Sequence, residues 1–181
     1  MEEHFDVCTP GGIPTGRSVH RSQAHREGLW HRSSHLWLVN SRGQILLQRR
    51  HPAKETDPGR WDIAVAGHLS AGQTPLDALV REAREELGLV LEPAQLTFLE
   101  ARPKEYREGA FLDREWQHLF VCLNDVDLGG LVLQADEVVD VRWMPWEEYR
   151  RIVAQGHPDY VGRKEDWPAF EAWMRQRLSA L

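Results

Sequence analysis

The sequence has little of what marks secreted, membrane or nucleic-acid-binding proteins. Its two cysteines, Cys8 and Cys122, form neither a disulfide framework nor a zinc motif, which favours a reducing compartment. No apolar run approaches the ~20 residues of a transmembrane helix, and residues 1–6 lack the basic and apolar regions of a signal peptide. The net charge of −6 provides no basic surface for nucleic acid. We therefore expect a cytoplasmic protein that binds neither membranes nor nucleic acids.

The composition is that of an ordinary globular domain. Hydrophobic residues make up 41% of the 181 residues and charged residues 28%, and a chain of this length can bury most of its apolar surface. No repeat, low-complexity segment or linker divides it. We predict one domain over residues 1–181.

The most informative segment runs from residue 67 to residue 89. Thr74 followed by Pro75 is typical of an N-cap and a first-turn proline, and Gly88 is typical of a helix end, so a helix is predicted over residues 75–87. Its apolar residues recur at helical spacing and predict a buried stripe. The stripe consists of Leu76, Leu79, Val80, Ala83 and Leu87.

Three carboxylates share a second face of this predicted helix. Glu82, Glu85 and Glu86 stand at i, i+3 and i+4, so they repel one another unless something neutralises them. Hard divalent cations such as Mg²⁺ prefer oxygen ligands and bring phosphate groups with them. A solvated acidic face is the competing interpretation of the same pattern.

The spacing of this segment resembles the Nudix box. Eight residues fall on positions of that pattern: Gly67, Arg81, Glu82, Ala83, Glu85, Glu86, Gly88 and Leu89. One position departs, because Gln73 stands where the pattern has a glutamate that supports the arginine and the loop. The resemblance implies a Nudix-type α/β/α sandwich with a central mixed sheet. It also implies that Glu82, Glu85 and Glu86 are catalytic residues that bind Mg²⁺ or Mn²⁺, with Arg81 bracing the box through Glu85 or nearby carbonyls.

The rest of the chain alternates strands and helices, as expected for a layered sandwich. A hairpin is predicted from residues 36–39 and 44–48, and a strand over 61–66 leads into the box. Further strands are predicted at 96–102, 117–123 and 138–144, followed by helices near 146–155 and 167–178. The last helix should turn Phe170, Trp173 and Met174 inward. Loops and short strands are expected before residue 30.

Outside the box, much of residues 4–150 resembles isopentenyl-diphosphate isomerase and the hydrolases similar to it. Residues 1–34 resemble an isomerase-like extension of the domain. In those isomerases three histidines and two acidic residues hold a second metal. The matching positions here are His25, His31, His68, Asp113 and Glu115. Imidazole and carboxylate together suit Mn²⁺, Fe²⁺ or Zn²⁺, although nine histidines in the chain also allow a chance alignment.

Two further groups of residues acquire roles from the same resemblance. Arg50 and Lys54 match positions that contact the substrate diphosphate, and exposed basic residues are the alternative interpretation. Glu137 stands where some Nudix enzymes supply a further acidic metal ligand, and a solvated turn residue is the alternative there.

The departures from the isomerases favour hydrolysis. Isomerases place a catalytic cysteine directly before the Gly-His pair, where this chain has Ala66, and alanine cannot transfer a proton. Isomerases also commonly place an arginine at the position of Glu82, whereas the acidic block is complete here.

We therefore predict a Mg²⁺-dependent hydrolase of a nucleoside-diphosphate-X or other organic diphosphate, with Glu82 the first candidate for the general base. An isomerase-like enzyme and a catalytically weak diphosphate-binding module, for which Gln73 is the hint, are the alternatives. The group X and the oligomeric state, with a homodimer among the options, are left open.

Overall fold

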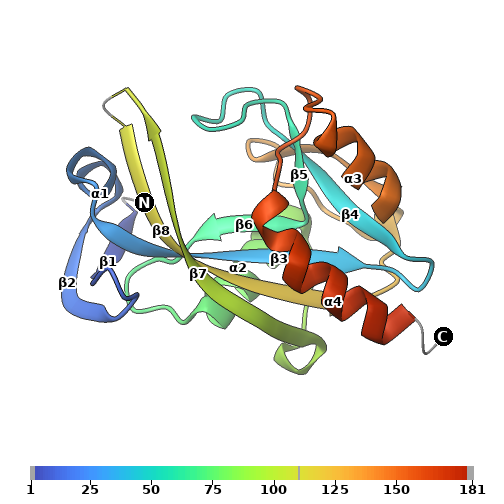
Figure 1. The fold of residues 1–181 in the computed structure, drawn as a ribbon, viewed down its shortest axis with the longest axis horizontal. Coiled ribbons are helices and arrows are strands. Elements are labelled where there is room, and N and C mark those ends of the chain that lie inside the picture. Colours follow the sequence, from blue (N-terminus) through green and yellow to red (C-terminus); the bar gives the residue numbers. More distant parts are fainter. Residues whose placement is uncertain (1–2, 110, 179–181) are drawn as a thin grey trace.

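The fold is built around a mixed sheet, seven-stranded in the described part of the chain (Figure 1). The computed structural model describes residues 3–109 and 111–178. Five strands lie in the order β5 (Trp61–Ile63), β4 (Gln44–Arg50), β3 (Trp30–Val39), β8 (Phe111–Leu123) and β7 (Leu96–Glu108). In addition, β6 (Val65–His68) pairs with β3, and β9 (Val138–Pro145) pairs with β4. The long strands β3 and β8 run parallel, and the other pairs are antiparallel.

Helices cover both faces of this sheet. The described helices are α1 (Arg21–Glu27), α2 (Pro75–Leu87), α3 (Trp146–Ala154) and α4 (Trp167–Leu178), with short 3-10 turns at Pro93–Gln95, Leu128–Gly130 and Lys164–Asp166. One sheet face, with Leu36 and Leu38, packs against α2. The other, with Trp37 and Val39, packs against α3 and α4. The predicted α/β/α sandwich is therefore confirmed. No helix among the described residues is long and apolar enough to cross a membrane.

The box helix has the predicted ends. The Thr74 hydroxyl accepts a hydrogen bond from the Asp77 backbone N–H at 3.2 Å, and the Asp77 carboxylate accepts from the Thr74 N–H, which completes a capping box. Gly88 ends the helix with a φ of 65°. A Cβ there would also meet backbone atoms of Val132 at 2.9 Å, so the position requires glycine. In the predicted stripe, Leu79, Ala83 and Leu87 are buried, with Leu76 and Val80 half-buried at its margin.

The prediction of one strand over residues 61–66 is wrong. The strand is interrupted at Ala64 and continues to His68, because the chain changes partners there: β5 pairs with β4, whereas β6 pairs with β3. In the described chain, β3 and β4 pair with each other at Val39 and Ile45, beside their turn. The two strands thus take different neighbours beyond the hairpin.

Two other predictions are too short or incomplete. The strands predicted at 96–102 and 117–123 extend to Glu108 and back to Phe111 as a long hairpin, and α1 lies in the segment predicted as loops and strands. The hairpin extension is polar because its inner side lines a cleft rather than an apolar core. Helix α1 is short and polar, so it carries little of the periodic signal by which helices are recognised. The helices near residues 146–155 and 167–178 and the buried Phe170, Trp173 and Met174 are confirmed.

The N-terminal segment forms a small unit beside the sheet. Strands β1 (His4–Cys8) and β2 (Pro14–His20) pair antiparallel, and Phe5, Val19 and Ala24 form an apolar cluster with α1. The Phe5 ring also stacks on the His31 ring, with centroids 4.8 Å apart. The unit therefore packs directly against a predicted metal ligand.

Candidate functional site

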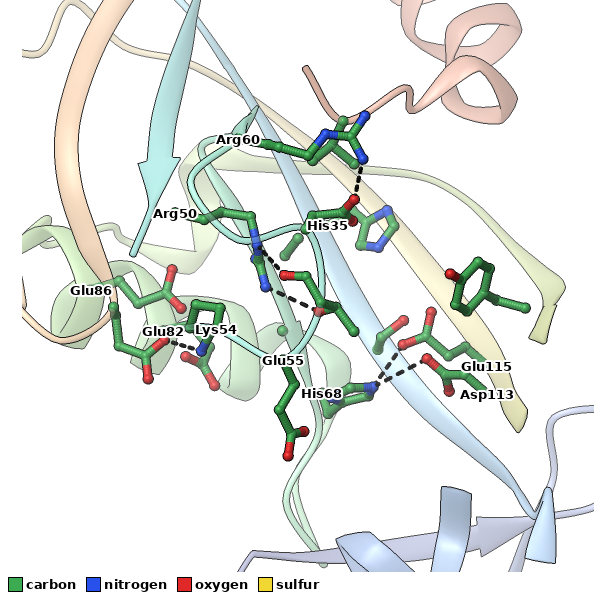
Figure 2. A pocket seen from close by; sticks show the side chains of 18 of the residues that line it. His35, Arg50, Lys54, Glu55, Arg60, His68, Glu82, Glu86, Asp113 and Glu115 are labelled. Atoms are coloured by element: carbon green, nitrogen blue, oxygen red, sulfur yellow. Dashed lines mark hydrogen bonds and ion pairs between the residues drawn. The ribbon is translucent and has the colours of Figure 1, made fainter. Parts of the chain in front are cut away.

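A cleft of ≈ 980 Å³ is bordered by β3, β4, β6, β8 and α2, and it brings the predicted site residues together. Those lining it are His25, Arg50, Lys54, His68, Glu82, Glu85, Glu86, Asp113, Glu115 and Glu137. His31 lies behind this surface and is 1% exposed. Figure 2 shows Glu82, Glu86 and Lys54 at one side of the cleft, with His68, Asp113 and Glu115 at the other.

Strand alternation determines which side chains face the cleft. Trp37 and Val39 of β3 belong to the core under α3 and α4, so His31, Ser33 and His35 continue the same face of that strand. The parallel strand β8 repeats the arrangement. Its corresponding residues are Asp113, Glu115, Gln117, Leu119 and Val121. One face of the sheet thus changes from an apolar core to a polar site along these two strands.

Three imidazoles and a carboxylate converge where the second metal is predicted. One ligand atom from each of His25, His31, His68 and Asp113 lies within 4.8 Å of the other three. The three Nε2 atoms and Oδ1 of Asp113 are buried without a hydrogen-bond partner. His31 Nδ1 lies 2.9 Å from the Leu29 carbonyl, and donation to it would leave Nε2 free to ligate. This donor set fits a divalent transition metal.

Glu115 lies beside this group and is ion-paired with one of its members. Its Oε1 is 2.8 Å from His68 Nε2, a close contact without hydrogen-bond geometry. Burial alone would lower the pKa of His68, but the Glu115 carboxylate reverses this effect and raises it. Burial alone would raise the pKa of Glu115, and His68 instead holds it well below its usual range. Burial lowers the pKa of His25 to about 4, which keeps its imidazole neutral at pH 7.

Arg81 holds two of the three box carboxylates, and its contact with Glu85 is the one that the family resemblance implies. Its Nη1 donates to Glu85 and its Nη2 to Glu82, both at 2.6 Å. Nη2 also lies 3.4 Å from Oε1 of Gln73, which accepts the Ser70 backbone N–H at 2.9 Å. Gln73 therefore supports the arginine and the loop, the role expected of the glutamate that it replaces.

Close packing explains the first glycine of the box. A Cβ on Gly67 would lie 3.1–3.2 Å from side-chain atoms of Glu82, so the glycine lets strand β6 approach α2 at this carboxylate. Burial raises the pKa of Glu82, against the charge of Arg81, which lowers it. The carboxylate thus lies in a tight, poorly solvated position at the edge of the cleft.

Glu86 is the most strongly perturbed carboxylate of the box. Burial, reinforced by the charge of Glu82, raises its pKa to about 7. Gln48 of β4 donates a hydrogen bond to Glu86 Oε2 at 3.1 Å. Two carboxylates that share a buried site resist ionisation together, and a bound cation would relieve that cost. The environment of Glu86 therefore favours a cationic partner.

The two predicted phosphate ligands are also in the cleft. Lys54 forms an ion pair with Glu137, so these two residues partner each other in the described structure. Arg50 donates through Nε to the Thr56 carbonyl at 3.1 Å and through Nη2 to the Thr56 hydroxyl at 3.2 Å. Its Nη1 lies 3.8 Å from the buried Asp62. The Arg50 guanidinium is thus fixed in place with N–H groups to spare.

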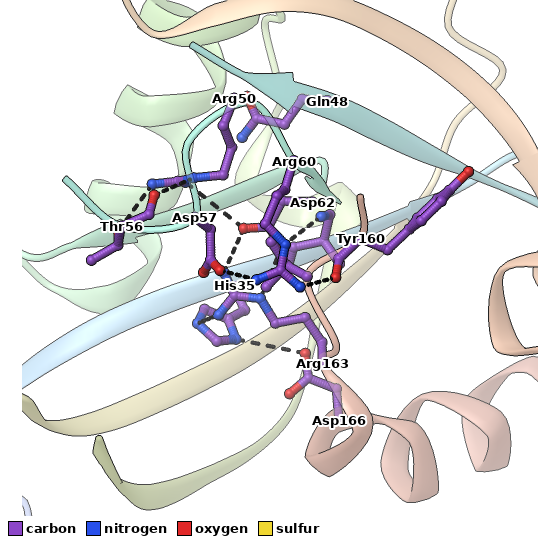
Figure 3. Close-up of polar contacts among 12 residues, drawn as sticks. His35, Gln48, Arg50, Thr56, Asp57, Arg60, Asp62, Tyr160, Arg163 and Asp166 are labelled. Atoms are coloured by element: carbon purple, nitrogen blue, oxygen red, sulfur yellow. Dashed lines mark hydrogen bonds and ion pairs between the residues drawn. The ribbon is translucent and has the colours of Figure 1, made fainter. Parts of the chain in front are cut away.

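A buried polar network that borders the cleft through His35 and Arg163 was missed by the sequence analysis (Figure 3). Asp62 is fully buried and accepts hydrogen bonds from Arg163 Nε at 2.9 Å and Nη2 at 2.6 Å. Arg163 Nη1 lies 3.3 Å from His35 Nε2, and His35 Nδ1 lies 3.6 Å from Asp166. Burial alone would raise the pKa of Asp62, but Arg163 outweighs it and the pKa is lowered. The available signal was an aspartate within the otherwise apolar segment 61–66, and it pointed to no partner.

Comparison with known proteins places this geometry in a family. The NUDIX domain profile matches residues 29–163. Nudix hydrolase 3 of Arabidopsis thaliana is 40% identical over 165 residues, which cover 88% of this chain and 21% of that protein. The chain thus spans about a fifth of the length of this relative. An isopentenyl-diphosphate Delta-isomerase of Escherichia coli is 30% identical over 142 residues, 78% of this chain and 76% of the isomerase.

The fold comparison agrees. A crystal structure of a Deinococcus radiodurans protein superposes with a TM-score of 0.64 at 24% identity, covering 85% of this chain and 90% of that one. The fold and the cleft define an α/β/α domain with an acidic helix at the edge of the cleft. The chain belongs to the Nudix family.

Proposed function

We propose that the protein is a Mg²⁺-dependent hydrolase that cleaves the diphosphate linkage of a nucleoside-diphosphate-X or another organic diphosphate. The observation that carries the proposal is that the acidic residues of the box and the basic residues Arg50 and Lys54 line one cleft. A cleft that holds both carboxylates and basic side chains suits a metal-bound diphosphate.

The proposed metal ligands are Glu82, Glu85, Glu86 and Glu137. Bound Mg²⁺ would neutralise phosphate oxygens and lower the pKa of a water molecule. Glu85 is the most exposed of the three box glutamates and shares Arg81 with Glu82, so a change in one contact affects the other. Glu82 is our first candidate for the general base, because it is close to the cleft and its pKa is raised.

In the proposed mechanism Lys54 has two partners, Glu137 and the substrate diphosphate. Its ion pair with Glu137 keeps both charges in the cleft while the protein is metal-free. If Glu137 bound a cation, Lys54 would be free to contact the phosphate groups together with Arg50, which lines the same cleft. The cation would add positive charge to the cleft, and the negative charge of the diphosphate would offset it.

An isomerase-like activity is the second candidate, and the convergence of His25, His31, His68 and Asp113 favours it. Ala66 argues against it. This residue lines the cleft two positions before His68, where isomerases have their cysteine, and a methyl group cannot carry a proton. A diphosphate-binding module without turnover is the third candidate. The sequence feature that suggested this module is Gln73. It no longer favours a loss of turnover, because its amide makes the contacts expected of a glutamate.

Product analysis separates these candidates. The purified protein would be incubated with a panel of nucleoside and prenyl diphosphates under titration with Mg²⁺ and Mn²⁺, and phosphate release and double-bond migration would be measured. We expect metal-dependent hydrolysis without migration. Migration would favour the isomerase, and tight binding without turnover at any metal concentration would favour the binding module. Ala66→Cys is expected to produce a trace of migration at most, because Glu82 remains near the diphosphate.

A further inference from the structure

Two buried polar atoms bordering the cleft have no partner in the described structure. They are the Ser33 hydroxyl and Oε1 of Gln117, on residues that are each 2% exposed. Ser33 and Gln117 are direct neighbours in the register between β3 and β8, and both line the cleft. A buried polar atom without a partner is unfavourable, because it has lost its hydrogen bonds to water and gained none in return. Two such atoms side by side at a cleft therefore point to a ligand that supplies their hydrogen bonds.

The chemistry of these atoms is defined by their surroundings. Gln117 donates through Nε2 to Glu115 at 2.7 Å, which orients the amide and leaves Oε1 as an acceptor. The Ser33 hydroxyl can both donate and accept. The adjacent Ser34 side chain faces the other side of the sheet, where its hydroxyl donates to the Pro75 carbonyl at 2.8 Å. Of these two neighbouring serines, the one that faces the cleft therefore has the unpartnered hydroxyl.

Arg163 adds hydrogen-bond donors to the same cleft. Asp62 holds its Nε and Nη2, and His35 holds its Nη1. If Nδ1 of His35 carries the ring proton, its Nε2 accepts from Arg163. A guanidinium carries more N–H groups than these three contacts use. The remaining ones are held in a fixed orientation at the cleft.

We propose that Ser33, Gln117 and Arg163 form a subsite for the X group, here named the polyol subsite, which takes a hydroxyl-bearing group such as a sugar ring. The inference rests on the proposed function, since X is the part of the substrate beyond the diphosphate. Neighbouring hydroxyls donate to Gln117, exchange a hydrogen bond with Ser33 and accept from Arg163. A hydrocarbon X would leave all of these groups unpaired, and sites built to hydrogen-bond a hydroxyl strongly reject an analogue without one.

Binding of two analogues that cannot be hydrolysed tests the subsite. The probes are the methylene-bridged analogues of UDP-glucose and of isopentenyl diphosphate, titrated by calorimetry into the full chain with Mg²⁺. We expect the sugar-bearing probe to bind about tenfold more tightly or better. Ser33→Ala should reduce that preference about fivefold, the equivalent of one hydrogen bond. It should leave binding of the isopentenyl probe unchanged and should not lower the Tm, because the deleted hydroxyl has no partner.

Ser34→Ala is the matched control. It removes an equally buried hydroxyl from the next residue, so it should lower the Tm without changing the preference between the probes. Equal binding of the two probes, no binding of the sugar-bearing probe, or an unchanged preference in Ser33→Ala would overturn the polyol subsite. Hydrolysis of organic diphosphates in those cases would leave the proposed function standing. Absence of hydrolysis with a clear sugar preference would overturn the function and retain the subsite.

Discussion

Glu86 couples protonation to metal binding at the scale of a single residue. With a pKa of about 7, Glu86 is protonated in about half of the metal-free molecules at neutral pH, whereas a metal ligand must be ionised. Metal affinity should therefore rise as the pH passes through 7. The unfolded chain has no such constraint, because an exposed glutamate ionises near its ordinary pKa.

This difference predicts a stability change in the metal-free protein. A carboxyl whose pKa is raised on folding costs stability as the pH rises from its unfolded to its folded value, here from about 4.5 to about 7. The free energy of unfolding in EDTA should fall across that range by on the order of 3 kcal/mol from this residue. Chemical denaturation of the wild type and Glu86→Gln checks this, since the difference between them isolates Glu86 from the histidines. Equal pH profiles would contradict it.

The same substitution tests the catalytic role. Glu86→Gln should lower turnover by about 100-fold or more at saturating Mg²⁺, because a neutral amide is a poor substitute for a carboxylate ligand. The fold should persist, since Gln48 can still donate to the side-chain oxygen. Glu148→Gln, an exposed change on α3, is the control and should have wild-type turnover. Normal activity of Glu86→Gln would remove the box from the mechanism.

Gln73→Glu should leave kcat/KM unchanged or raise it modestly. The oxygen that accepts from Ser70 and Arg81 is retained, and the added charge faces the guanidinium. Steady-state kinetics on the preferred diphosphate would measure the effect. A loss beyond about tenfold, or a kcal/mol-scale drop in stability, would show that the loop depends on the neutral amide.

At the scale of elements, the second metal site depends on several segments meeting. His25 comes from α1, His31 from β3, His68 from β6 and Asp113 from β8. We predict that the protein purified without chelator retains about one transition metal per chain and that His68→Ala abolishes this retention, because a small ligand set loses a direct bond. Elemental analysis measures it, with His157→Ala as an exposed control. Hydrolysis should partly survive, since the box is separate. A metal-free wild type would reduce the histidine match to shared ancestry.

Local signals account for the elements that sequence predicts well. Helix α2 carries its stop and start signals in Thr74, Pro75 and Gly88, so its ends agree with the prediction. The break at Ala64 could not be predicted, because it arises from a change of strand partner that no local pattern encodes. Arg163 was missed for a similar reason. Its partner Asp62 is about a hundred residues earlier in the sequence, and their pairing exists in the folded chain alone.

At the scale of the whole molecule, the second metal site was predicted from the resemblance to the isomerases, because the spacing of its residues in the sequence forms no local motif. The five residues of the second site are spread over some ninety positions, and the structure brings His25, His31, His68 and Asp113 together with Glu115 alongside. Their roles, like those of Arg50, Lys54 and Glu137, stay predictions until metal and kinetics are measured. The domain over residues 1–181 likewise stays a prediction that limited proteolysis can test, and sedimentation can measure the oligomeric state. The polyol subsite could not be predicted from the sequence, because a serine and a glutamine form no motif and their pairing across β3 and β8 exists only in the folded chain.

The alternation of β3 has a consequence for how this enzyme can change over evolutionary time. His31, Ser33 and His35 share one side of the strand, and Ser34 and Leu36 serve the opposite side. An insertion or deletion of one residue would exchange the two sets and spoil the site and the α2 packing together. Point substitutions at Ser33 change one contact and leave the others in place. We therefore expect the substrate preference of related proteins to change through substitutions on the cleft side of β3. We expect the length of the strand to stay the same.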